Sequence, residues 1–116
     1  MPQHRLLTEF GMGTSLRRQD YTSAAKKALM DALWHNSINL AELFGFPKEA
    51  MILTVEIGVQ QPDQVDVQAL IDVFPYGRPT VHVVHGGMDV PRGDGGKPTV
   101  IANAAISVSF DMEVAP

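Results

Sequence analysis

The residues best suited to binding a ligand lie in one short segment, from Gly11 to Asp20. Two glycines open it, and Arg17 and Arg18 stand just ahead of a helical pattern. Guanidinium groups bind carboxylates and phosphates through paired hydrogen bonds, and the unpaired amides at a helix start also attract anions. The alternative is a capped helix start with solvated arginines. The segment predicts a site for a small anion, made of Gly11, Gly13, Thr14, Ser15, Arg17, Arg18, Gln19 and Asp20.

Four polar residues further along the chain are candidates for the same pocket. Glu56 in mid-strand is placed for general acid or base work, although an acid there more often pairs with an Arg or His across strands. His82 and His85 are three apart in a strand and face opposite ways, so they do not form a metal-chelating pair. We expect Glu56 and His85 to move protons and His82 and Asn103 to contact the ligand. We expect neither a metal site nor a cofactor.

Composition narrows the class of protein. The 116 residues predict a single domain, residues 1–116, with 45% hydrophobic content. A formal net charge of −4 argues against a nucleic-acid binder, and the absence of cysteine excludes disulfides and thiolate chemistry. The sequence shows neither an apolar run of membrane-spanning length nor a signal-peptide pattern, so we expect a cytoplasmic location and no membrane partner.

Hydrophobic periodicity divides the chain into alternating strands and helices. An alanine-rich stripe from Tyr21 to Leu33 marks a helix that Asp20 or Thr22 caps, and Gly11 and Gly13 are expected to end the first strand. Asp63 or Asp66 caps a second, short helix. The expected elements are a strand at 4–10, a helix at 20–37, a helical turn at 40–44, a strand at 51–60, a helix at 66–74, strands at 80–85 and 99–110, a mobile loop at 86–98 and a C-terminal tail at 111–116.

This β-α-β-α-β-β order predicts an α/β (α+β) fold, a four-stranded mixed sheet with two helices on one face. The other face would carry polar residues such as Glu56 and His82 beside apolar ones such as Val84. A face of that mixed character favours a homo-oligomer in which a second copy covers it.

Two resemblances follow from these patterns. The topology resembles the bacillus chorismate mutase-like fold, whose members commonly form trimers with ligand clefts between subunits. The sequence resembles a small bacterial and plant family first named from a Listeria conserved hypothetical protein, which carries a Gly-x-Gly-x-Asp-x-His-Gly motif and a Gln-Asp-x-Thr-x-Ala-Ala helix start. Ser15, Arg17 and Arg18 stand at the motif's Asp, His and last Gly, and arginines there favour an anion. The matching residues are Gly11, Gly13, Gln19, Asp20, Thr22, Ala24, Ala25, His35-Asn36-Ser37, Pro75-Tyr76-Gly77, Val84-x-Gly86-Gly87 and Asn103-Ala104-Ala105.

The resemblance implies no activity, so two functions follow from the residues. The first is a small homo-oligomeric protein, a trimer or a multiple of one, that binds a small anionic metabolite at a subunit-boundary pocket and transfers a proton. The second is a non-catalytic assembly or partner-binding subunit whose polar sheet face is only an interface.

Overall fold

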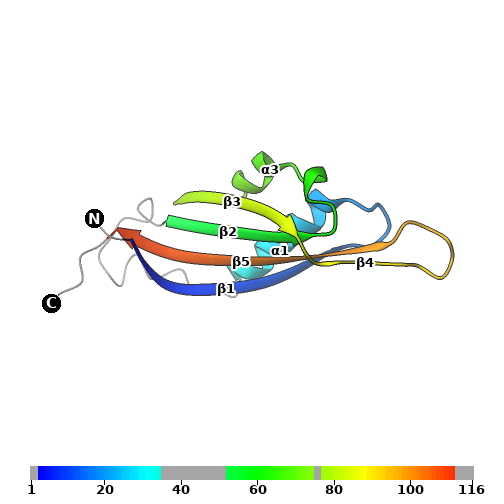
Figure 1. Cartoon of the computed structure of the whole chain (residues 1–116), viewed down its shortest axis with the longest axis horizontal. Helices are drawn as coiled ribbons and strands as arrows, with labels where there is room; N and C mark the ends of the chain where they lie inside the picture. The colour runs from blue at the N-terminus through cyan, green and yellow to red at the C-terminus, as the bar shows by residue number, and fades with distance from the viewer. Residues whose placement is uncertain (1–2, 35–51, 75–76, 112–116) are drawn as a thin grey trace.

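The computed structural model describes residues 3–34, 52–74 and 77–111, which form one mixed sheet with helices on one side (Figure 1). The predicted helical turn at 40–44 and nearly all of the predicted C-terminal tail lie outside the described residues. The sheet contains β1 (Gln3–Ser15), β2 (Ile52–Val59), β3 (Arg78–His85), β4 (Met88–Val90) and β5 (Thr99–Asp111). The predicted fold class is confirmed, with one more strand than expected.

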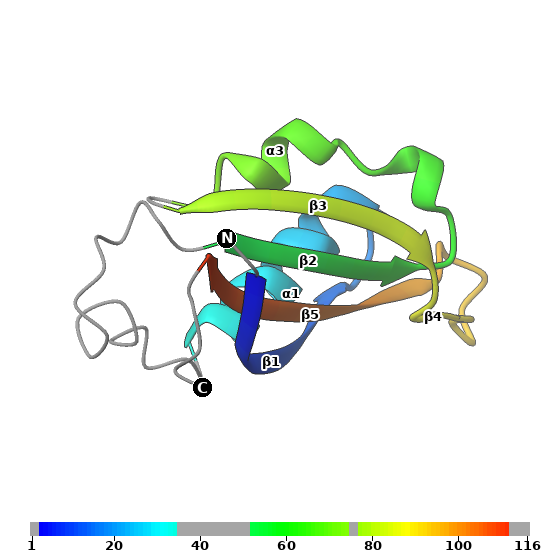
Figure 2. The same ribbon diagram turned by 60° about the vertical axis from the view of Figure 1, so that its left-hand side comes forward.

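The strand order is β1-β5-β2-β3, and β4 pairs with β5 outside this path. β2 and β3 run parallel, while β5 is antiparallel to β1, β2 and β4. Parallel neighbours need a crossover connection, and here it contains the 3-10 helix η2 (Pro62–Gln64) and the helix α3 (Val67–Ile71). The long helix α1 (Tyr21–Trp34) connects β1 to β2 on the same side of the sheet (Figure 2).

Both helices begin where the sequence predicts a cap. The Asp20 carboxylate accepts a hydrogen bond from the Ser23 amide at 2.9 Å, and Asp66 does the same for Ala69 at 3.3 Å. The buried stripe of α1 consists mostly of alanines, whose small side chains let the helix lie close to the sheet. Its fully buried members are Ala24, Ala25, Ala28, Leu29 and Ala32.

One hydrophobic cluster fills the space between the helices and the sheet. Alternate residues of the two central strands point into it, as the period-two patterns predict. Leu70 of α3 and Tyr21 of α1 complete the cluster from the other side. The strand residues are Leu53, Val55, Ile57 and Val59 of β2 and Val100, Ala102, Ala104, Ile106 and Val108 of β5.

The expectation that Gly11 and Gly13 end the first strand is wrong, because β1 continues to Ser15. A Cβ atom on Gly13 would lie 2.3 Å from the Ala24 carbonyl oxygen and 2.3 Å from the Ala28 amide nitrogen. One on Gly11 would lie 2.3 Å from the Ala28 carbonyl oxygen. The two glycines therefore allow close contact between strand and helix, and they do not form a turn.

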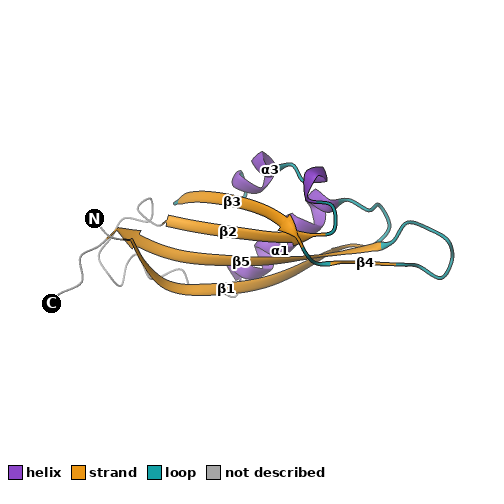
Figure 3. Cartoon of the chain, viewed as in Figure 1, coloured by secondary structure: helices purple, strands orange, loops and turns teal. Residues whose placement is uncertain are grey.

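Residues 86–98, predicted as one loop, contain the three-residue strand β4. β4 pairs with the start of β5, and the resulting hairpin extends beyond the rest of the sheet (Figure 3). Gly87 has a φ of 61°, and a Cβ there would lie 2.1 Å from the Ile101 carbonyl oxygen, so glycine is required where the chain turns into β4.

The second side of the sheet, which we call the open face, is covered by none of the described helices. The strand registers place its side chains in rows across β1, β5, β2 and β3. Phe10 and Met12 are 68% and 55% exposed there, and Thr8 and Ser107 share a 3.1 Å hydrogen bond. The rows are Thr8, Ser107, Thr54 and Thr80; Phe10, Ala105, Glu56 and His82; and Met12, Asn103, Gly58 and Val84.

Candidate functional site

The bend between β1 and α1 forms the rim of a hollow of about 350 Å³, which we call the cationic hollow. Three of its lining residues are cations, two from the bend and one from the second turn of α1. Among the described residues neither arginine has an ion-pair or hydrogen-bond partner, and Lys27 Nζ donates to the Thr14 carbonyl oxygen at 3.1 Å. The lining residues are Ser15, Leu16, Arg17, Arg18, Asp20, Ser23 and Lys27.

Hydrogen bonds fix the shape of the bend. The Asp20 amide donates to Ser15 Oγ at 3.1 Å, and the Asp20 carbonyl accepts from the Ala24 amide at 3.1 Å. Because the Asp20 carboxylate already accepts from the Ser23 amide, it occupies the position where a free helix start attracts an anion. We therefore expect an anion in the hollow to bind side-chain donors of the lining, chiefly those of Arg17, Arg18 and Lys27.

The last residue of the bend before the cap also organises a buried polar cluster. Gln19 has a φ of 51°, in the left-handed region that residues other than glycine rarely adopt. Its Nε2 donates to the Tyr21 hydroxyl at 3.0 Å, and that hydroxyl donates to Asp89 Oδ2 on β4. The cluster links the arginine-bearing bend to the β4–β5 hairpin.

Tyr21 and Asp89 meet at a partly buried position. Tyr21 is only 2% exposed. Burial raises the pKa of its phenol above the usual range, and the hydrogen bond to Asp89 acts in the same direction, while the Gln19 amide opposes it. Tyr21 thus remains a hydrogen-bond donor across the neutral range. The Asp89 Oδ1 atom is buried and has no partner among the described residues.

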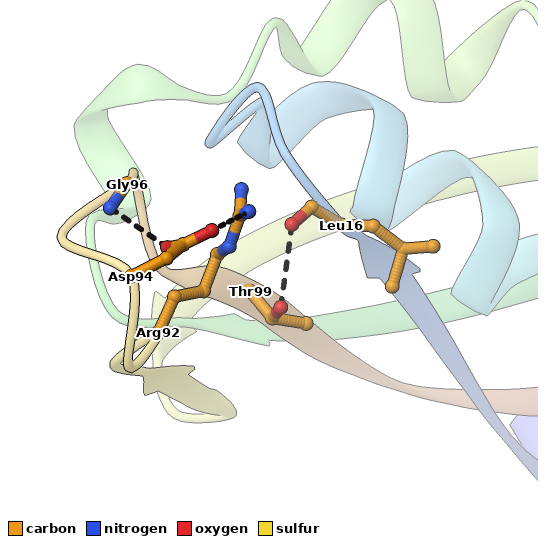
Figure 4. A network of polar contacts seen from close by, with 5 residues as sticks. All are labelled: Leu16, Arg92, Asp94, Gly96 and Thr99. Carbon is orange, nitrogen blue, oxygen red and sulfur yellow. Dashed lines mark hydrogen bonds and ion pairs between the residues drawn. The ribbon is translucent and has the colours of Figure 1, made fainter.

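The hairpin reaches the bend through a second contact. Thr99 Oγ1 donates to the Leu16 carbonyl oxygen at 3.3 Å, and Arg92 pairs with Asp94 at the hairpin tip (Figure 4). Asp94 also accepts from the Gly96 amide at 3.0 Å. The hairpin tip has its own ion pair, so Arg92 is not a free cation beside the hollow.

The structure brings together only part of the predicted site. Ser15, Arg17, Arg18 and Asp20 line the hollow, while Gln19 binds Tyr21 and Thr14 offers its carbonyl to Lys27. Gly11 and Gly13 lie against α1. The remaining candidates are exposed in the sheet and do not line the hollow of the same chain: Glu56, His82, His85 and Asn103. That they share a pocket with the hollow stays a prediction that requires a second chain.

Sequence reasoning missed Ser23 and Lys27 in the hollow. The apolar stripe of α1 places Lys27 on the solvated side of the helix, where it is exposed, but does not show which residues lie beside it. Asp20, Ser23 and Lys27 have the spacing i, i+3, i+7, which places them on one helical stripe. That stripe begins two residues after Arg18, and its spacing is the sequence signal that could have predicted Ser23 and Lys27 in the hollow.

Within the described parts of the chain, no group of three or more histidine, aspartate or glutamate side chains is arranged to hold a metal ion. In those same parts no helix combines the length and apolar character that crossing a membrane requires.

The fold and the hollow define a small α+β protein with a helix-covered mixed sheet and a cationic depression where the first strand meets the first helix. The chain belongs to a family of conserved hypothetical proteins (Lin0512_fam), whose model matches residues 5–108. This confirms the predicted family.

The chain is also similar to an FtsZ-like protein of unknown function from Nostoc punctiforme, whose crystal structure is known. The two share 33% sequence identity over 97% of this chain and 99% of the other, with a TM-score of 0.86. No functionally curated protein matches the chain significantly.

Proposed function

We propose that this protein binds a small anionic metabolite in the cationic hollow. The observation that carries the proposal is the grouping of Arg17, Arg18 and Lys27 around one depression with a single carboxylate, Asp20. Like charges repel, and such a grouping costs free energy unless an anion offsets it. Two of the three cations also have no protein partner among the described residues.

Proton transfer is the finer part of the proposal. Glu56 and His82 are direct neighbours in the parallel β2–β3 pair and both are exposed, so an acid and a base stand side by side on the open face. They reach a ligand in the hollow only if another copy brings its open face to that hollow. The proposed proton-transfer site is therefore one between subunits.

Removing cations from the hollow should weaken anion binding by about tenfold each, because a charge-assisted hydrogen bond contributes about 1.5–3 kcal/mol and tenfold corresponds to 1.4 kcal/mol. The measurement is isothermal titration of the full chain with a panel of phosphates and carboxylates at low salt. Lys27→Met should weaken binding about tenfold, and Arg17→Ala/Arg18→Ala should weaken it about a hundredfold.

The matched control for this experiment is Lys26→Met. Lys26 is the exposed neighbour of Lys27 on α1 and does not line the hollow. Lys26→Met changes the net charge as Lys27→Met does but leaves the hollow intact, so anion binding should be unchanged. Equal losses in the two methionine variants would mean that only overall charge matters and would rule out the site.

A second candidate function, self-assembly, is favoured by the exposed apolar side chains of the open face. Phe10, Met12, Val84 and Met88 are all exposed there, and Met88 reaches 58%. Four strands of eight to thirteen residues measure roughly 20 Å by 25–40 Å, so two copies packed face to face bury about 500–800 Å² each. That approaches the roughly 800 Å² per partner of a stable interface.

The open face should therefore control the oligomeric state. Phe10→Asp replaces the most exposed apolar side chain of the open face, on the edge strand β1, with a charge. It should give monomers by sedimentation velocity, whereas the parent chain sediments as an oligomer. Met30→Asp is the matched control, because Met30 is 60% exposed on α1, away from the open face. A parent chain that is monomeric at high micromolar concentration contradicts the proposal.

A further inference from the structure

We infer that the ligand of the cationic hollow is a small phosphate monoester bound as its dianion, an inference that rests on the proposed function and names its ligand class. The first argument is charge. Arg17, Arg18 and Lys27 face one carboxylate, that of Asp20, so the lining carries two excess positive charges. A phosphate monoester above its second pKa of about 6 carries two negative charges, whereas a simple carboxylate carries one.

The second argument is a buried hydroxyl in the lining. Ser15 is only 6% exposed, and its Oγ accepts a hydrogen bond from the Asp20 amide. Its own hydrogen is therefore free to donate, and the described residues provide no acceptor for it. The three oxygens of a phosphate monoester offer such acceptors while also contacting the guanidinium groups.

The third argument is the size and character of the hollow. About 350 Å³ is at the small end of ligand pockets, which span about 300–1,000 Å³. Among the described residues that line it, Leu16 is the only apolar one and none is aromatic. A nucleotide base would find no stacking partner there, so the hollow fits a small phosphorylated compound without an aromatic ring.

The test uses a pH difference that only a phosphate ligand produces. Within the part of the chain that the structure describes, the titratable and charged groups that line the hollow are Arg17, Arg18, Asp20 and Lys27, with no histidine. Glycerol 3-phosphate changes from mostly monoanion at pH 5.0 to mostly dianion at pH 7.5, since its second pKa is about 6. Sulfate is a dianion at both pH values, so it reports any change in the protein itself.

We expect glycerol 3-phosphate to bind the full chain about five- to tenfold more tightly at pH 7.5 than at pH 5.0, by isothermal titration. Sulfate should change less than about twofold, and acetate should bind at least about tenfold more weakly than glycerol 3-phosphate at pH 7.5. Asp20→Asn keeps an N-cap oxygen and removes the one opposing charge, so it should raise the affinity for glycerol 3-phosphate several-fold.

Two outcomes would overturn the inference, and they are distinct. In the first, glycerol 3-phosphate and acetate bind equally well, or the affinity for glycerol 3-phosphate does not change with pH. Either result excludes a phosphate dianion as the preferred ligand while leaving anion binding intact. The absence of binding by every anion, in a chain that melts cooperatively, removes the proposed function and the inference with it.

Discussion

Gly13→Ala is expected to destabilise the protein by about 3 kcal/mol, among the largest effects of any single methyl group in this chain. The added Cβ would lie 2.3 Å from backbone atoms of both Ala24 and Ala28, and backbone cannot rotate away as a flexible side chain does. The helix would have to move off the strand and lose part of its contact with the core. Urea unfolding measures the change, and the melting temperature should fall by about 10 °C.

Gly93→Ala is the matched control for this substitution. Gly93 lies in the hairpin connection, and a Cβ there would meet no atom within 4 Å. Its effect should be within about 0.5 kcal/mol of zero. A Gly13→Ala protein as stable as the parent would contradict the close strand–helix contact.

Tyr21→Phe is expected to cost about 1.5–3 kcal/mol, the range of hydrogen bonds to charged groups. The substitution removes the only hydrogen-bond donor that Asp89 has among the described residues, and Asp89 Oδ1 is already buried without a partner. Asp89 is half-buried, and leaving its carboxylate without hydrogen bonds costs more than the loss of a solvated hydroxyl. Urea unfolding again measures the loss.

A double-mutant cycle separates this cause from lost packing. Asp89→Ala removes the carboxylate that Tyr21→Phe leaves without a hydrogen bond. The free energy of unfolding lost by Tyr21→Phe should therefore be much smaller in the Asp89→Ala background than in the parent. We expect a coupling energy of about 1–2 kcal/mol. Additive effects of the two substitutions would show that the hydrogen bond contributes little to the fold.

Elements with a long regular pattern could be predicted from the sequence. The alanine stripe of α1 and the alternating apolar residues of β2 and β5 each require burial on one side only, so their faces follow from spacing. The caps Asp20 and Asp66 followed from local chemistry, because a carboxylate three residues ahead of a free amide satisfies it. These elements determine the sheet and the side that the helices cover.

Glycine was ambiguous where the pattern was short. Gly11 and Gly13 fit a turn as well as a close approach between strand and helix, and only the position of α1 decides between them. The three-residue strand β4 has no periodicity to detect, and it exists because β5 offers it a partner. Local sequence contains neither fact.

Only the part of the candidate site that is local in the sequence could be predicted. Arg17 and Arg18 are adjacent to the helix start in the sequence, so their grouping is local. Asp89 is 68 residues from Tyr21, and a hydrogen bond across that separation follows from the hairpin's path and not from any motif. Lys27 lines the hollow together with the arginines because its position on α1 places it beside the bend.

The most direct test of the cationic hollow is an amide chemical-shift titration of the labelled full chain with glycerol 3-phosphate at pH 7.5. Saturable shift changes should concentrate at Ser15–Asp20 and at Ser23 and Lys27. In a monomer the amides of Glu56 and Asn103, on the open face, should not shift, whereas in an oligomer whose open face closes the hollow they should shift together with the bend. Changes centred on the open face with an unaffected bend would contradict the account, and so would the absence of any saturable change.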